Sequence, residues 1–126
     1  MTKIDDVKVK PRLVFPVSIM GLTWFIFVLS EEDYIKTVPD DPDCPAYTLT
    51  GLNRIVFRAG NINSGLIRHE VFHSFVHCLP IASANLNKDQ FEEVIAEFLQ
   101  QHWGHYCSLV DLISKQIKKA RIKVVA

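Results

Sequence analysis

Short apolar runs separated by turn-forming residues dominate the first half of the chain, and this pattern predicts strands. The runs are rich in valine, isoleucine, phenylalanine and tryptophan, which favour a pleated, half-buried surface. Gly21 and the segment Gly51-Leu52-Asn53 supply turns between them. Four strands are expected: Leu13–Ile19, Thr23–Leu29, Ala46–Thr50 and Arg54–Arg58.

The segment from Leu13 to Ser30 contains no charged residue and is close to the shortest stretch that can span a membrane as a helix. Pro16 and Gly21 divide it, however, and β-branched and aromatic residues crowd both halves. Two buried strands joined near Gly21 explain the pattern better than a membrane helix. We therefore expect no membrane partner.

Helical signals begin at Ser30, which precedes three acidic residues and is expected to cap a short helix over Glu31–Val38. The proline-rich segment 39–45 is expected to be a loop. A second helix is expected to begin at Asn63 or Ser64 and to run to about Cys78, since Pro80 follows it.

A longer helical pattern occupies the C-terminal third of the chain. Asn87 and Gln90 form a capping-box pattern, and apolar residues then repeat at helical spacing to about Ile122. Gly104 is expected to kink this helix or to divide it into two. The order of elements predicts an α+β fold, with a small, mainly antiparallel sheet followed by helices. A chain of 126 residues is expected to form one domain over residues 1–126.

The candidate chemistry lies in His69-Glu70-Val71-Phe72-His73, which has the pattern H-E-x-x-H on a predicted helix. His69 and His73 are about one turn apart, so both imidazoles can point at one metal ion, with Glu70 near the same face. His77 extends this polar stripe and is interpreted as a bystander. The alternative is a pair of solvent-facing histidines on an ordinary amphipathic helix.

A third metal ligand has to come from another element, and acidic residues on the following helix are the candidates. Glu92 and Glu93 are adjacent, so only one of them can face inward. Glu93 and Glu97 form an i, i+4 pair beside the apolar stripe of that helix. A carboxylate in that place is expected to be partly buried, which is costly unless it is paired or bound to metal.

With an H-E-x-x-H helix followed by a glutamate-bearing helix, the chain resembles the gluzincins, a family of zinc metallopeptidases. The likeness is to minimal, single-domain phage or bacterial members with a zincin-like fold. In the thermolysin branch of that family the glutamate ligand follows the second histidine by 20 positions, as Glu93 follows His73. The resemblance therefore implies that Zn²⁺ is bound by His69, His73 and Glu93, and that Glu97 orients His69 without touching the ion. It also implies that Glu70 is the catalytic general base toward a metal-bound water.

The resemblance covers roughly residues 46–103. The strand Arg54–Arg58 resembles the edge strand that binds extended peptide substrates in these enzymes. The family's separate C-terminal domain, with its transition-state-stabilising residue, has no counterpart in this sequence. His102, His105 and Tyr106 are the nearby candidates for that role.

The expected function is therefore an enzyme, a zinc-dependent hydrolase and most simply a small metallopeptidase with a peptide or protein substrate. The alternative is a metal-binding accessory or regulatory module that retains the site with little turnover. Because 14 basic residues balance 14 acidic ones, no nucleic-acid partner is expected. A basic cluster near the C-terminus is interpreted as cations at a helix end rather than as a binding patch. Its members are Lys115, Lys118, Lys119, Arg121 and Lys123.

The cysteines favour a reducing compartment, because Cys44, Cys78 and Cys107 are far apart and form no C-x-x-C pair. The polar first ten residues do not resemble a secretory signal. A cytoplasmic protein is expected. The sequence leaves its oligomeric state and its substrate open.

Overall fold

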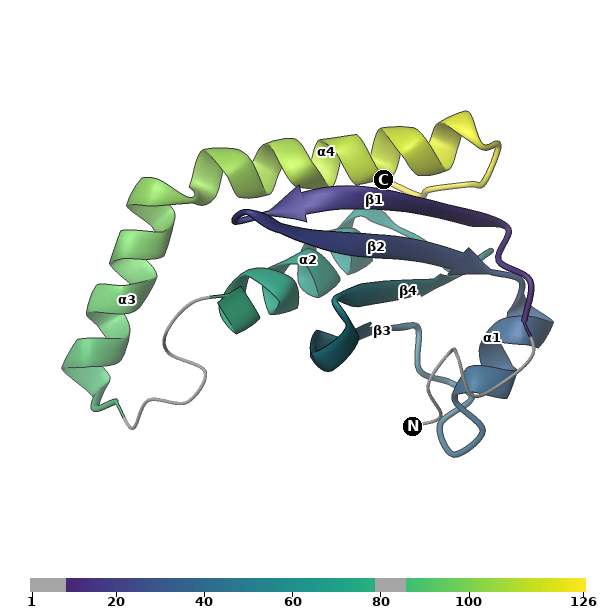
Figure 1. The fold of residues 1–126 in the computed structure, drawn as a ribbon, viewed down its shortest axis with the longest axis horizontal. Coiled ribbons are helices and arrows are strands. Elements are labelled where there is room, and N and C mark those ends of the chain that lie inside the picture. Colours follow the sequence, from purple (N-terminus) through teal and green to yellow (C-terminus); the bar gives the residue numbers. More distant parts are fainter. Residues whose placement is uncertain (1–8, 79–85) are drawn as a thin grey trace.

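The computed structural model describes residues 9–78 and 86–126, and within them the chain forms an α+β fold (Figure 1). The strands are β1 (Leu13–Ile19), β2 (Leu22–Leu29), β3 (Ala46–Leu49) and β4 (Arg54–Arg58). The helices are α1 (Glu31–Thr37), α2 (Ser64–Cys78), α3 (Lys88–Gln101) and α4 (Trp103–Lys119), with a short 3-10 turn η2 (Thr50–Leu52). The predicted elements are confirmed with small shifts at their ends. Pro80, which was expected to end α2, lies outside the described residues.

The four strands form one mixed sheet in the order β1-β2-β4-β3. β1 pairs with β2 and β3 pairs with β4 in antiparallel hairpins, as predicted. β2 and β4 pair in parallel, from Phe25 opposite Arg54 to Leu29 opposite Arg58. The sheet is therefore mixed, because β3 begins at the end of the sheet where β2 ends and runs back, so that β4 has the same direction as β2.

The expected position of Arg54–Arg58 at an edge of the sheet is wrong. β4 lies between β2 and β3, and β3 is the edge strand. Ile55, Val56 and Phe57 in β4 are all fully buried. Consecutive buried apolar residues are typical of a strand that is covered on both faces, which is the environment of an interior strand.

Each face of the sheet carries its own apolar cluster, because successive residues of a strand point to opposite sides. Ile55 and Phe57 belong to the larger cluster, which includes residues of α2 and α4, whereas Val56 belongs to the smaller one beneath α1. α2 contacts β1 and β3 of the sheet as well as α4. α2 is thereby held between the sheet and α4.

The predicted caps are confirmed. The Ser30 side chain accepts a hydrogen bond from the backbone N–H of Asp33 at the start of α1. Asn87 and Gln90 form the complete capping box of α3. The long C-terminal pattern divides at His102, two residues before the predicted break at Gly104.

α3 packs on the rest of the molecule through one part of its apolar stripe. Phe98 is buried, but Phe91 and Leu99 are 50% and 52% exposed. Glu93 and Glu97 are exposed as well. The expected partial burial of these carboxylates is therefore wrong in the described structure, because α3 extends away from the sheet instead of lying along it (Figure 1).

The uncharged segment 13–30 forms β1, a turn and β2, so the membrane-helix alternative for that segment is excluded. The described helices include no stretch with the length and apolar character needed to cross a bilayer.

Candidate metal centre

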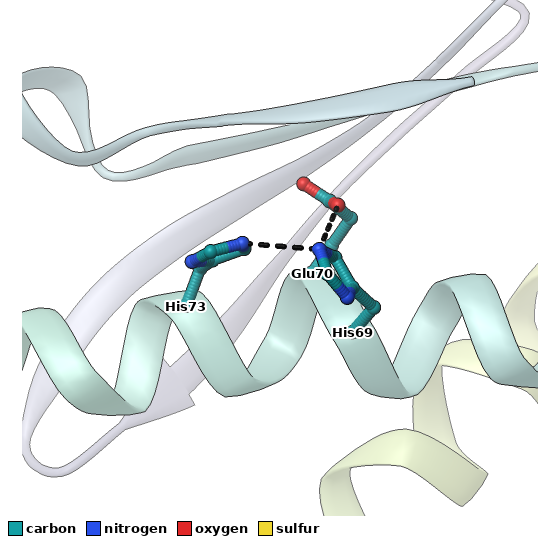
Figure 2. Close-up of side chains that lie close together, drawn as sticks. All are labelled: His69, Glu70 and His73. Carbon is teal, nitrogen blue, oxygen red and sulfur yellow. Dashed lines mark hydrogen bonds and ion pairs between the residues drawn. The ribbon is translucent and has the colours of Figure 1, made fainter. Parts of the chain in front are cut away.

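The candidate centre lies on the side of α2 that faces β3. Ile67, Val71 and Phe75 are fully buried on the other side of the helix and fix its rotation against the core. This packing leaves His69 and His73 exposed. Figure 2 shows both rings on the same side of the helix, with the Glu70 carboxylate next to them.

The two imidazoles converge at a distance that suits one ion. His69 Nε2 and His73 Nε2 are 3.1 Å apart. Two nitrogens that bind one tetrahedral zinc at about 2.0–2.1 Å are themselves about 3.3 Å apart. The same distance also fits a hydrogen bond between one protonated and one unprotonated ring nitrogen, so the geometry permits both arrangements.

Glu70 completes a group of three possible ligands. Its Oε2 lies 3.9 Å from His69 Nε2. The ligand atoms of His69, Glu70 and His73 all lie within 4.8 Å of one another, and they form the one such group in residues 9–78 and 86–126. Two neutral imidazoles and one carboxylate are a donor set that suits zinc.

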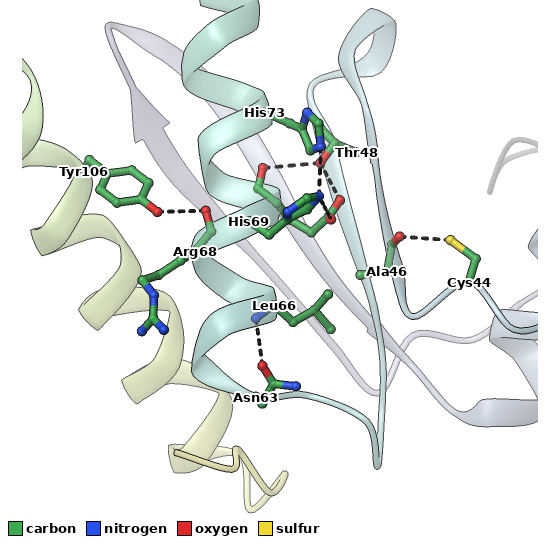
Figure 3. Close-up of polar contacts among 10 residues, drawn as sticks. Cys44, Ala46, Thr48, Asn63, Leu66, Arg68, His69, His73 and Tyr106 are labelled. Carbon is green, nitrogen blue, oxygen red and sulfur yellow. Dashed lines mark hydrogen bonds and ion pairs between the residues drawn. The ribbon is translucent and has the colours of Figure 1, made fainter. Parts of the chain in front are cut away.

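Thr48 of the edge strand β3 contacts Glu70 twice (Figure 3). Its hydroxyl lies 3.0 Å from Glu70 Oε1 and 3.3 Å from the backbone carbonyl oxygen of Glu70. Glu70 is only 5% exposed, so this contact compensates part of the cost of burying its carboxylate. The sequence did not predict this role for Thr48, because the contact depends on how α2 packs against β3.

A cavity of about 560 Å³ opens between α2 and β3 at the candidate centre. Tyr47 and Thr48 line it from the strand, and His69, Glu70 and His73 line it from the helix. His77 also lines this cavity and makes an edge contact with the Trp24 ring, but it is not part of the three-residue group.

The acidic residues predicted on the next helix lie outside this group. Glu93 is exposed on α3 and is not among the converging ligand atoms. Glu97 accepts a hydrogen bond from Gln101 Nε2 at 3.1 Å on its own helix. The structure therefore brings together His69, Glu70 and His73, and it does not bring Glu93 or Glu97 to them.

The three residues considered for the transition-state-stabilising role, His102, His105 and Tyr106, each contact other parts of the fold. The Tyr106 hydroxyl donates to the backbone carbonyl of Arg68 at 2.8 Å, and burial raises the pKa of this phenol. The His105 ring packs on Phe75, and the His102 ring packs on Phe98. Tyr106 thereby joins α4 to α2 behind the histidines.

Comparison with known proteins points away from a peptidase. The chain is 32% identical over 62 residues to large ribosomal subunit protein bL20 of Ehrlichia chaffeensis. This match covers 48% of the chain and 47% of the relative, so the chain spans about half the length of the curated relative it matches. No family model and no solved structure matches the chain.

The bL20 match contradicts the gluzincin resemblance and the enzyme, zinc hydrolase and metallopeptidase function drawn from it, together with the accessory module offered as its alternative. The relative is a ribosomal protein, which is not an enzyme. The motif was misleading because it is short. Any helix that carries histidines four residues apart, with a glutamate directly after the first, matches H-E-x-x-H and places both histidines on one face. The predicted role of Glu70 as general base rested on the peptidase assignment and loses its basis with it.

The predicted partners are corrected by the same match. A ribosomal relative counts against the expectation that no nucleic acid is involved. The peptide-substrate expectation also loses its structural basis, because Arg54–Arg58 is not at an edge of the sheet. Zero net charge misled here because a net value does not show how charges are distributed over a molecule.

Proposed function

We propose that His69 and His73 together bind one divalent transition-metal ion, with Zn²⁺ as the expected ion. The observation that carries the proposal is the 3.1 Å approach of the two Nε2 atoms beside the Glu70 carboxylate. Neutral imidazole nitrogens bind zinc well, and a nearby carboxylate offsets part of the positive charge of the ion.

The third ligand is either Glu70 or Glu93. Glu70 is supported by its place in the converging group. Glu93 is supported by the spacing in the sequence, and it would require α3 to move toward α2. In both cases the bound ion would stabilise the folded state.

Zinc titration of the purified protein, with a chromophoric chelator as competitor, tests the proposal. We expect a single ion per chain, and at a free zinc concentration of about 100 times Kd a stabilisation of about 2.7 kcal/mol. His73→Ala should remove most of the affinity, whereas His105→Ala, which alters an exposed histidine outside the group, should leave it unchanged. Wild-type protein that binds no zinc, or equal affinity in the two variants, would refute the site.

We propose as a second candidate function that the chain associates with the large ribosomal subunit. The observation that favours it is the 32% identity to large ribosomal subunit protein bL20 over about half of each chain. Sedimentation of labelled protein with purified large subunits tests it, with small subunits as the control. Selective sedimentation with large subunits is expected, and equal or absent sedimentation with both particles would contradict it.

A cytoplasmic location follows as part of these proposals. Cys44, Cys78 and Cys107 are free cysteines in the structure, in agreement with a reducing compartment. A single domain over residues 1–126 is likewise proposed, and the larger apolar cluster supports it because it draws residues from β1, β2, β4, α2, α3 and α4.

A further inference from the structure

We propose that the C-terminal end of α4 and the segment after it form a surface that binds the phosphate backbone of RNA. The basic end, as we name it, consists of Lys115, Lys118, Lys119, Arg121 and Lys123. The inference rests on the second proposed function, association with the large ribosomal subunit, and it deepens that function by naming the surface and the chemical group recognised.

The basic end concentrates charge in a neutral chain. Five basic residues and no acidic residue occur between Leu112 and Ala126. All five are exposed. Among the described residues, no ion pair involves any of these five cations.

The helix dipole explains only part of this charge. A helix C-terminus carries about half a negative charge, and its effect is confined to the last turn. Lys118 and Lys119 lie in the last turn of α4, but Lys115 precedes it, and Arg121 and Lys123 follow the end of the helix. The number of cations therefore exceeds what the end of α4 attracts by itself.

The segment after α4 is held in place, so the basic end is part of the folded structure. Ile122 is buried. The backbone N–H of Val125 donates to the carbonyl of Ile62 at 3.0 Å, and the N–H of Ser64 donates to the carbonyl of Val125 at 2.9 Å. Lys123 is thus carried on an ordered segment next to the start of α2, and little ordering entropy would be lost when it binds.

The acidic residues of α3 lie at the other end of the molecule. Asp89, Glu92, Glu93 and Glu97 are exposed on α3, and Figure 1 shows α3 and the C-terminal end of α4 at opposite ends. Four negative charges are therefore kept away from the basic end. A polyanion would be drawn to the basic end and repelled by α3, which sets the orientation of approach.

The chemistry of the surface favours RNA phosphates over a membrane. An anionic membrane binds strongly to a basic helix that also inserts an apolar face. The residues between the cations of the basic end are small, polar or buried: Gln116, Ile117, Ala120 and Ile122. The exposed apolar residues Leu112 and Val125 lie at opposite ends of the segment and form no continuous apolar face. Lysine binds phosphate as a compact point charge, so recognition here would depend on the backbone and not on base sequence.

The test measures binding of a fluorescently labelled fragment of large-subunit ribosomal RNA by anisotropy at several salt concentrations. Contact with up to five phosphates predicts that log K falls with log salt with a slope of about −3 to −5. Lys118→Glu/Lys119→Glu should weaken binding at least about tenfold and make the slope shallower by about 1.5–2. Lys118→Gln/Lys119→Gln should show a smaller loss in the same direction.

The matched control is Lys36→Glu/Lys88→Glu, which changes the formal charge equally at exposed lysines outside the basic end. It should keep the wild-type slope, and circular dichroism should show that all variants are folded. Equal losses in the two glutamate variants would overturn the proposal, as would the absence of RNA binding by wild-type protein. Stronger binding to polyglutamate or to anionic lipid vesicles than to RNA would also overturn it.

The outcomes separate this inference from the function on which it rests. If the variants bind RNA as predicted but the wild type does not sediment with large subunits, the surface stands and the ribosomal association fails. If the wild type sediments with large subunits and the Lys118→Glu/Lys119→Glu protein does so equally well, the association stands and the basic end is not the contact surface.

Discussion

His69 and His73 face each other because residues four apart lie one above the other on a helix. This part of the centre was predictable from local spacing alone. The contact between Thr48 and Glu70 was not, because it joins residues that are brought together by the packing of α2 on β3. Glu93 has the expected spacing in the sequence, yet its distance from the histidines depends on the direction that α3 takes.

Replacement of Thr48 by valine is expected to destabilise the fold by about 1–3 kcal/mol, because Glu70 would lose a hydrogen-bond donor while remaining buried. Urea unfolding measures the change. Thr50→Val makes the same chemical change at an exposed position and should shift the free energy of unfolding by less than about 0.5 kcal/mol. Indistinguishable effects would show that the Thr48 hydroxyl does not support Glu70.

The third zinc ligand can be assigned by comparing Glu70→Gln, Glu93→Gln and Glu92→Gln in the zinc titration. The variant that loses a metal ligand should show a larger decrease in zinc affinity than the roughly 10–100-fold decrease that follows the loss of a group hydrogen-bonded to a ligand. We expect Glu70→Gln to show this larger decrease, since the Glu70 carboxylate lies in one group with His69 and His73. Glu92→Gln is the control for the charge of α3. A larger loss in Glu93→Gln would show that α3 moves to the ion.

At the scale of elements, the strands, the helices and the caps followed from signals within each segment. Short apolar runs rich in β-branched and aromatic residues, the Ser30 cap and the Asn87–Gln90 box all act over a few residues. The parallel pairing of β2 with β4 could not be predicted in this way, because it joins segments separated by α1 and β3. The resulting interior position of β4 was therefore missed.

Two phenylalanines on the same apolar stripe of α3 should respond very differently to truncation. Phe98→Ala is expected to cost about 3–5 kcal/mol, because the ring is 2% exposed and contacts Phe72, Phe75 and Tyr106. Phe91→Ala should cost less than about 1 kcal/mol, because that ring is 50% exposed. Denaturant midpoints compare the two. Similar large costs would mean that α3 packs along its whole length.

At the scale of the molecule, charge and burial are distributed in ways that totals conceal. The chain has no net charge, yet four exposed acidic residues lie on α3 and five exposed basic residues form the basic end. The positions of helices α3 and α4 create this separation, and composition alone could not reveal it. The same fold places all the tyrosines of the chain in buried positions.

Alkaline pH is expected to unfold the protein through its tyrosines. Burial raises the pKa of Tyr34, Tyr47 and Tyr106 above the usual value near 10. Since the unfolded chain loses these protons first, the stabilisation is complete below about pH 10 and declines as pH rises toward the folded-state pKa values. Absorbance of tyrosinate and circular dichroism should change together. Ionisation of all three phenols near pH 10 with the fold intact would contradict this.

The parallel seam between β2 and β4 has a consequence for the kinetics of folding. The hairpins β1–β2 and β3–β4 contain only local pairings, and isolated hairpins form in about 1–10 μs. The seam joins them only after a long loop that includes α1 has closed, so it raises the contact order and is the natural slow step. Substitutions along the seam should therefore slow folding, whereas substitutions in α3, which has few long-range contacts, should mainly accelerate unfolding.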